Sequence, residues 1–412
     1  MRWRSILSGS ERLSKLPFIV VCIPAFFLLV VTLRRWLFTI VALLSPQQRE
    51  SSPPPSLPTV LLLVPFRNEA LALPDLLDAL LRLDFSPAHL LVVLVDDGSG
   101  DDSAAVCARV VEEQSNWRLL QLPRNMGKAA ALNAALDRYS HGEFVAVYDA
   151  DERPSPDALR RLVAAAQPPQ VAAVSGRRAL SNPLASPTAS YVALENLAHQ
   201  LITQQAKDRL HLAPAILGSN CLYRRRALEQ VGRFRAGALL EDSDLTLRLA
   251  RAGWELRFVP DAVSYHAAPH TFAGYWRQHQ RWAGGFQDVA QRQMLSALRN
   301  SRLSWRLRLE LALFSLGYAD RLALAAVAFV VLAGEFAGKR LPALRRLLAL
   351  ALVTPFVQVA AALFRVRAPW ALWLRLSLLP IYFLLDVGMA FTGIARTVLG
   401  RAPAWRPRIS GA

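Results

Sequence analysis

The sequence has few cysteines. Its 412 residues contain only Cys22, Cys107 and Cys221, which stand far apart with no Cys-x-x-Cys pair and no histidine beside them. Disulfide-stapled domains and structural zinc sites both need several cysteines or histidines at close, regular spacing. The cysteine pattern therefore excludes a disulfide framework and a structural zinc site, and we expect three reduced thiols.

Charged residues are also scarce, at 19%, whereas 53% of the residues are hydrophobic. This balance excludes a disordered chain and is too apolar for an ordinary soluble protein. Acidic residues are fewer than basic ones, 31 against 48, which gives a formal net charge of +17. This charge by itself suggests a phosphate-rich partner. That partner would be either nucleic acid or anionic lipid.

The position of the charge favours lipid. Residues 1–50 carry 7 basic and 2 acidic side chains, residues 51–300 carry 26 and 25, and residues 301–412 carry 15 and 4. A nucleic-acid-binding protein would have its excess charge in the soluble part. We therefore expect a lipid bilayer and no nucleic acid as partner, with the basic ends flanking membrane segments.

Two long apolar regions lie at the ends of the chain. The first, Pro17 to Leu33, would span about 25 Å as a helix. Because four basic residues precede it, a secretory signal is the competing reading, but the run is long and lacks a small-x-small exit. We interpret residues 1–44 as an uncleaved membrane anchor and the Pro- and Ser-rich residues 45–58 as a linker.

The second apolar region begins after residue 300. Residues 301–318 have the pattern of an amphipathic helix lying in the membrane interface. Candidate membrane spans follow at about 311–333, 347–364 and 370–395, and they contain Asp320, Arg321 and Asp386. Charges in such segments usually face the protein interior or a polar channel. Residues 301–412 are thus expected to form an interfacial helix and about three spans.

The middle of the chain, residues 59–300, has the pattern of an α/β domain. Near-continuous apolar runs, such as TVLLLVPF and HLLVVLVDD, alternate with helical patterns. Strands of this kind form a parallel sheet that is buried on both faces. Polar residues follow each run, and open α/β sheets bind ligands at those strand ends. The strand ends are therefore where we look for a site.

Two groups of carboxylates follow expected strands. Glu69 and Asp97 could accept hydrogen bonds from a nucleotide base or ribose, although Asp-Asp-Gly-Ser is also a common turn. Asp149 and Asp151 flank Ala150 and could hold a hard divalent cation through oxygen ligands. Asp-x-Asp is frequent by chance, so its place at a strand end is what gives it weight.

Two further groups lie later in the chain. Glu241, Asp242 and a third acid precede a helix, where acids are ordinary capping partners but could also raise one pKa and produce a general base. Gln278, Arg281 and Trp282 offer a phosphate-binding fork and a flat surface for a sugar ring. A basic aromatic belt at a membrane surface is the alternative.

Taken in order, these elements resemble the membrane-embedded glycosyltransferases of family 2, the group that contains cellulose, hyaluronan and poly-N-acetylglucosamine synthases. The resemblance covers about residues 55–300 by motif and the rest by its flanking spans. It rests on the segments VPFRNE, LVDDGS, RNMGKAAALNAAL, YDADE, LGSNCLYRRRAL, LLEDSD and QHQRW.

The resemblance implies a GT-A fold, which is a Rossmann-like nucleotide-sugar-binding domain, flanked by transmembrane helices. It also implies an inverting hexosyltransferase that uses a nucleotide-diphosphate sugar, with UDP-sugar as the expected donor. The implied donor-binding residues are Glu69, Asp97, Lys128, Asp149 and Arg281. Asp151, with Asp149, would hold Mg²⁺ or Mn²⁺, Asp242 would be the catalytic base, and Gln278, Trp282 and Glu241 would bind the acceptor.

The same resemblance leaves the acceptor open. Q-x-x-R-W occurs in processive polysaccharide synthases, which we narrowly favour, and in enzymes that add one sugar to a lipid. Leu240 stands where the family often has Thr. Nucleotide sugars would place the catalytic domain in the cytosol, at a bacterial inner membrane, although the basic residues on both sides of the first span leave the orientation of the termini open. Neither the sugar nor any export or accessory subunit is identified.

Overall fold

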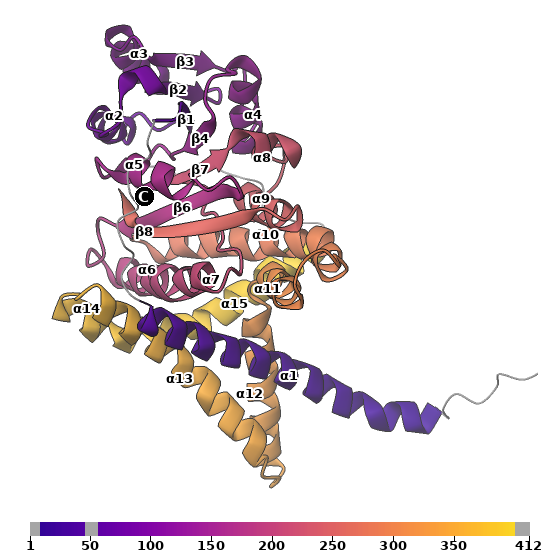
Figure 1. The fold of residues 1–412 in the computed structure, drawn as a ribbon. Helices are drawn as coiled ribbons and strands as arrows, with labels where there is room; N and C mark the ends of the chain where they lie inside the picture. Colours follow the sequence, from indigo (N-terminus) through magenta and orange to yellow (C-terminus); the bar gives the residue numbers. More distant parts are fainter. Residues whose placement is uncertain (1–8, 46–56, 400–412) are drawn as a thin grey trace, which may run out of the picture.

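The computed structural model describes residues 9–45 and 57–399, so the first eight residues, most of the expected linker and the last thirteen residues lie outside the described ranges. One eight-stranded sheet has helices on both faces, and long helices from both ends of the chain lie beneath it (Figure 1). Its strands are β1 (Val60–Phe66), β2 (Leu90–Asp96), β3 (Trp117–Gln121), β4 (Phe144–Val147), β5 (Arg153–Pro154), β6 (Val171–Leu180), β7 (Cys221–Arg224) and β8 (Glu255–His266).

The strand order is β3-β2-β1-β4-β7-β6-β8-β5. The first four strands are mutually parallel, whereas β7 is antiparallel to both of its neighbours. The predicted α/β domain with a parallel sheet is therefore confirmed for the N-terminal half. In the other half, antiparallel pairing brings segments from far along the chain to the side of β4.

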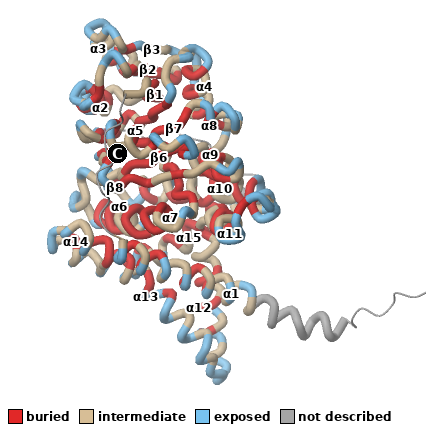
Figure 2. Tube along the Cα trace, in the orientation of Figure 1, coloured by how far each residue is buried: buried red, intermediate tan, exposed pale blue. Residues whose placement is uncertain are grey.

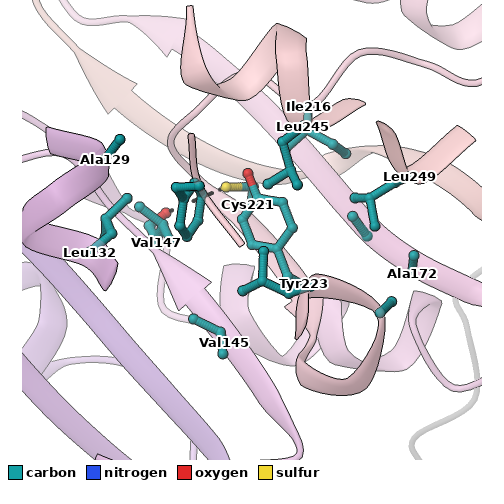
Figure 3. Packing of buried hydrophobic residues seen from close by; sticks show 14 of the residues in the cluster. Ala129, Leu132, Val145, Val147, Ala172, Ile216, Cys221, Tyr223, Leu245 and Leu249 are labelled. Atoms are coloured by element: carbon teal, nitrogen blue, oxygen red, sulfur yellow. Dashed lines mark hydrogen bonds between the residues drawn. The ribbon is translucent and has the colours of Figure 1, made fainter. Parts of the chain in front are cut away.

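The apolar runs form strands because both of their faces are covered. In β1, Leu61 and Leu63 belong to one buried cluster, while Val60, Leu62 and Val64 belong to another on the opposite face. Successive side chains of a strand point to opposite faces, so a continuous run supplies both clusters. Figure 3 shows part of the first cluster, and Figure 2 shows that buried positions concentrate around the sheet.

Helices from residues 73–298 connect and cover these strands. They are α2 (Leu73–Leu81), α3 (Ser103–Glu113), α4 (Lys128–Arg138), α5 (Ala158–Ala165), α6 (Pro187–Ala198), α7 (Gln205–Arg209), α8 (Arg225–Gln230), α9 (Glu241–Arg251) and α10 (Phe272–Leu298). A π-helical segment, His199–Gln204, joins α6 to α7, and a short 3-10 turn, Pro87–His89, precedes β2.

The remaining helices come from the two ends of the chain. They are α1 (Gly9–Leu44), α11 (Trp305–Ser315), α12 (Ala319–Phe336), α13 (Pro342–Arg365), α14 (Trp370–Leu374) and α15 (Leu379–Val398), with a 3-10 turn, Arg375–Leu378, before the last. Within the described ranges, three segments are long and apolar enough to cross a membrane: Val21–Leu44, Pro342–Arg365 and Trp370–Arg396.

The expected span 311–333 is divided. Helices α11 and α12 meet at an angle of 77°, and counting them as one broken span would raise the number of crossings to four. The break lies at Gly317 and Tyr318, where Tyr318 adopts a left-handed φ of 72°. A Cβ on Gly317 would come within 3.0 Å of the Phe286 ring, so α10 packs directly against the break. The two helices together still pass as one apolar stretch, so hydropathy alone does not predict the bend.

Charged residues at the membrane boundary are paired across helices. Arg34 of α1 contacts Glu310 of α11 at 2.6 Å, and the almost fully buried Lys207 of α7 contacts the same carboxylate at 3.2 Å. Arg35 contacts Asp320 of α12 at 2.7 Å. Arg34 and Arg35, which are among the basic residues that flank the first apolar run, therefore also fix α1 to α11 and α12.

Candidate active site

Three of the predicted site segments meet at one edge of the sheet. β1 lies between β2 and β4, and all three run in the same direction. Glu69 follows β1, Asp97 follows β2, and Asp149 follows β4. Carboxyl ends of adjacent parallel strands coincide, and that edge is where open α/β sheets bind ligands.

Asp97 organises the loop that precedes α4. Its buried carboxylate accepts hydrogen bonds from the Met126 and Gly127 amides, at 2.6 and 2.8 Å. Its neighbour Asp96 accepts from the Ser99 amide at 2.8 Å, which forms the turn that Asp-Asp-Gly-Ser suggests. The turn reading thus holds for Asp96, whereas contact of Asp97 with a nucleotide stays a prediction. The Asp97 bonds fix the start of the helix that carries Lys128.

Glu69 lies on the neighbouring loop. Its backbone amide donates to the Ser103 hydroxyl at 2.8 Å, at the beginning of α3. Asn68, immediately before it, adopts a φ of 55° and accepts from the Gly100 amide at 2.8 Å. These bonds tie the loop after β1 to the loop after β2, so Glu69 is held beside the Asp97 segment.

Lys128 joins acids from two distant segments. Its ammonium lies 2.7 Å from Asp149 Oδ1, 3.4 Å from Glu241 Oε1 and 2.8 Å from the Gly218 carbonyl oxygen. Burial alone would lower the pKa of Lys128, but the charges of Asp149 and Glu241 raise it above its usual value. Lys128 is therefore a permanent cation between the end of β4 and the start of α9.

Asp242 lies beside this cluster and has an unusual pKa. Burial, followed by the charge of Glu241, raises its pKa to about 6, against the opposing effect of Lys128. One oxygen, Oδ1, accepts from the Ser243 amide at 2.6 Å. On the other side is Gly218, where an added Cβ would lie 2.8 Å from Asp242 Oδ2. The carboxylate is thus held in a space that only glycine leaves open.

The three acids at the start of α9 have separate roles in the structure. Glu241 faces Lys128 and Asp242 faces Gly218, whereas the fully buried Asp244 pairs with Arg248 at 2.8 Å and accepts from Gln293. The helix has no side-chain N-cap bond at Leu240. Simple capping therefore does not account for the first two acids.

Helix α10 carries the last predicted group. Gln278, Arg281 and Trp282 are spaced i, i+3 and i+4, which places them on one face. Arg281 donates to the Leu239 carbonyl at 3.5 Å and lies close enough to lower the pKa of Asp242. The Gln278 Oε1 atom is buried and accepts no hydrogen bond from the described residues. This face therefore presents a cation and a free acceptor beside the α9 acids.

Trp282 is positioned from the membrane side. His279, which is fully buried, packs its ring 4.8 Å from the Trp282 ring and places Nε2 3.1 Å from Glu195 of α6. One turn earlier, the Tyr275 hydroxyl donates to Asp386 of α15, a carboxylate that is only 1% exposed. The intramembrane acid thus faces the protein interior, as expected, and anchors the motif helix.

A divalent cation fits the residues that follow β4. The described residues contain no group of three or more histidine, cysteine or acidic side chains that could enclose a metal. Asp149 and Asp151 still supply two carboxylates at a strand end, and Mg²⁺ is typically held by one or two carboxylates together with substrate phosphates. The donor set therefore suits a cation shared with a diphosphate.

Sequence reasoning missed two buried partners of this site. Arg178, on β6, places Nε 2.5 Å from Glu152 and Nη2 3.5 Å from Asp149, and Glu152 is fully buried. Ser219 accepts from the Asp149 amide at 2.8 Å. Only the two charges of Arg177 and Arg178, which follow an apolar start of the strand, could have pointed to it. Together they fix the backbone and the charge of Asp149.

The pKa of Asp242 predicts an acid limit to any reaction in which it acts as base. Below pH 6 the carboxylate is protonated, so kcat/KM should fall about tenfold per pH unit, and above pH 6 it should level off. Steady-state rates between pH 4.5 and 8 check this, with donor affinity measured over the same range as control. A flat profile from pH 5 to 7 would exclude Asp242 as the titrating base.

Comparison with known proteins gives one family. A family model described as "Glycosyltransferase like family 2" matches residues 57–285, more than half of the chain. A structure of the mannosyltransferase PcManGT from Pyrobaculum calidifontis, in complex with GDP-Man and Mn²⁺, has a TM-score of 0.65 at 23% identity, covering 93% of this chain and 98% of that one. That likeness confirms the predicted GT-A fold.

Curated relatives include enzymes with different acceptors. Identity is 30% over 248 residues with the probable glycosyltransferase YdaM of Bacillus subtilis, covering 59% of this chain and 58% of the relative. It is 29% over 235 residues with the beta-monoglucosyldiacylglycerol synthase of Trichormus variabilis (56% and 50%), and 27% over 241 residues with the poly-beta-1,6-N-acetyl-D-glucosamine synthase of Staphylococcus epidermidis (58% and 57%). The matched region thus spans between half and three fifths of these relatives.

Proposed function

The chain belongs to glycosyltransferase family 2, and from that premise we propose that it transfers a sugar from a nucleotide-diphosphate sugar to an acceptor at the membrane, with inversion at the anomeric carbon. The observation that carries this proposal is the Asp242 carboxylate, whose raised pKa of about 6 suits a general base. It lies beside Lys128 and the two carboxylates that Lys128 contacts, at the ligand-binding edge of a parallel sheet.

The donor would lie along the strand ends. Glu69 and Asp97 are the proposed contacts for the nucleoside, and the Asp97 bonds to the α4 loop support a rigid wall there. Lys128 and Arg281 would attract the diphosphate, and Asp149 would orient Lys128. A UDP-sugar is the expected donor, carried over from the family resemblance.

Asp149 and Asp151 would hold Mg²⁺ or Mn²⁺, which supplies positive charge to offset the charge that develops on the departing diphosphate. Arg178 supports this arrangement because it pairs with Glu152 and places Nη2 3.5 Å from Asp149 Oδ2. The carboxylate of Asp149 is thereby kept in place before any ligand binds.

In the proposed transfer step one bond forms, one bond breaks and one proton moves. The acceptor hydroxyl oxygen forms a bond to the anomeric carbon as the bond from that carbon to the diphosphate oxygen breaks. The hydroxyl proton passes to Asp242 Oδ2, and the nucleoside diphosphate leaves with the electron pair. Because attack and departure occur on opposite faces, the configuration inverts. Lys128 and Arg281 lie near enough to stabilise the negative charge.

The acceptor would lie between α9 and α10. Gln278 Oε1, which is buried and has no donor among the described residues, would accept from an acceptor hydroxyl, and Trp282 would pack against the acceptor sugar. Glu241 would help to orient the same hydroxyl beside Asp242. Elongation of a polysaccharide is our first candidate, and single transfer to a lipid is the second because of the similarity to a glucosyldiacylglycerol synthase.

We place the catalytic domain on the cytosolic side of a bacterial inner membrane, because nucleotide sugars are made in the cytosol.

A donor screen tests the proposal. Full-length protein in lipid nanodiscs is incubated with a panel of labelled UDP- and GDP-sugars, Mg²⁺ or Mn²⁺, and a bacterial membrane extract. We expect one donor to be consumed, with release of nucleoside diphosphate and a product of opposite anomeric configuration by NMR. A product that retains the donor configuration, or failure to use any donor, would contradict it. Product length decides the acceptor, since only mono-glycosylated lipid would remove the polymerase candidate.

A further inference from the structure

A groove of about 460 Å³ lies where three membrane-side helices end. It is lined by Leu43 in the last turn of α1 and Ser45 just after it, by Leu363, Phe364 and Arg365 at the end of α13, by Arg367 and Ala368 in the following turn, and by Trp373 of α14. Figure 1 shows these helix ends together directly below α6, on the side of the bundle that faces the catalytic domain. The groove therefore belongs to the membrane surface nearest that domain, apart from the transfer site.

The groove is positively charged. Arg365 and Arg367 both line it, and among the described residues neither makes an ion pair with a carboxylate. Arg365 donates one N–H to the Ala42 carbonyl in the last turn of α1, which orients its guanidinium across the two helix ends. Arg209, at the end of α7, lies near enough to act on Arg365 electrostatically. Arg365 and Arg367 thus supply two positive charges that have no carboxylate partner among the described residues.

The rest of the groove is apolar and open to the bilayer. Leu43 is 47% exposed, Phe364 is 74% exposed and Trp370, next to the lining, is 72% exposed. Tryptophan and arginine are characteristic of the level of the lipid headgroups, where the ring is apolar and the cation meets phosphate. A soluble anion would leave this apolar surface in contact with water.

We propose that this groove binds an anionic phospholipid, with its phosphate between Arg365 and Arg367 and an acyl chain along Leu43, Phe364 and Trp373. Charge complementarity selects the headgroup. A zwitterionic lipid would bring its own cation into a site that already has two, whereas an anionic lipid supplies the missing negative charge. The site does not depend on the proposed transfer reaction, since none of its residues belongs to that machinery.

The test compares two arginines at opposite ends of α13. Arg367→Asn removes the groove charge, and Asn is chosen because Arg367 has a left-handed φ of 49°, which Asn tolerates. Arg340→Asn is the control, since Arg340 is exposed and lies just before the other end of the helix. Native mass spectrometry of the full chain in detergent counts bound phosphatidylglycerol and phosphatidylcholine in a titration, with inorganic phosphate as competitor.

We expect the unaltered protein to bind phosphatidylglycerol more tightly than phosphatidylcholine. Arg367→Asn should weaken phosphatidylglycerol binding about fivefold, while Arg340→Asn leaves it unchanged. Equal retention of the two lipids by the unaltered chain would overturn the proposal without any variant. So would equal effects of the two substitutions, or displacement of the lipid by inorganic phosphate at the same concentration, which would indicate a simple anion site.

Discussion

Replacement of Asp242 by Asn should abolish transfer while leaving the donor bound. Asn keeps the shape of the side chain but cannot take the acceptor proton, and loss of a general base costs about 10²–10⁴-fold in rate. The neighbouring cations remain, because Lys128 still contacts Asp149 at 2.7 Å and Arg281 still contacts the Leu239 carbonyl. We therefore expect kcat to fall by that factor, with the Kd for the nucleotide sugar within about threefold of the original. Single-turnover kinetics and calorimetric donor titration measure the two quantities.

A matched control for this variant is Asp288→Asn. Asp288 also carries a carboxylate near arginines, pairing with Arg235 and with Arg292 at 2.5 and 2.7 Å, but it lies on α10 and is not among the acids that contact Lys128. Its replacement should leave kcat close to the original value. Unchanged turnover by Asp242→Asn would remove the base assignment, whereas parallel loss of donor binding would show that Asp242 belongs to the donor site.

The sequence was sufficient to place the predicted residues at one edge of the sheet. Glu69, Asp97 and Asp149 each follow a near-continuous apolar run, and such runs form parallel strands whose carboxyl ends coincide. The position of each residue at the end of an apolar run is a local property, so the hydrophobic pattern predicts it. The residues that lie next to them in space could not be predicted in this way, because strand order and the antiparallel direction of β7 depend on packing between distant segments.

Contacts between those distant segments account for what sequence reasoning missed. Asp97 bonds to amides 29 and 30 residues later, and Arg178 pairs with Glu152 across the sheet. No periodicity or propensity links such positions. The bend between α11 and α12 is a similar case, since it depends on how closely Gly317 approaches Phe286 of α10 and not on the apolar character of either helix.

Some basic residues near the ends of the chain form specific ion pairs and do not only flank membrane segments. Arg34 and Arg35 are held by Glu310 and Asp320, so two of the basic residues near the first span connect helices instead of facing headgroups. A buried pair of this kind adds little net stability but penalises any arrangement that separates the partners. These charges thus specify how α1 packs. Arg365 and Arg367, which line the groove at the end of α13, are the ones proposed to bind lipid headgroups.

Gly218→Ala should reduce transfer about 100-fold without removing a single chemical group from the site. Gly218 has a φ of 73°, and a Cβ there would lie 2.8 Å from Asp242 Oδ2 and 3.3 Å from its carboxyl carbon. Oδ2 is the proposed proton acceptor, since Oδ1 already receives the Ser243 amide. The carboxylate must therefore turn or shift, and a displacement of about 1 Å in a reacting group costs on the order of 10²-fold.

Backbone strain alone has to be separated from this effect, and Gly253→Ala does so. Gly253 follows α9 with a φ of 89°, and a Cβ there would meet nothing within 4 Å. Both substitutions place a side chain in the left-handed region at a cost of roughly 1–2 kcal/mol, so both should lower the thermal unfolding midpoint by a similar amount. Only Gly218→Ala should lower kcat/KM, and its pH profile should move as the surroundings of Asp242 change. Equal activity of Gly218→Ala and Gly253→Ala would mean that the Asp242 carboxylate can move without loss of activity. The position in which the structure holds Asp242 would then not be required for transfer.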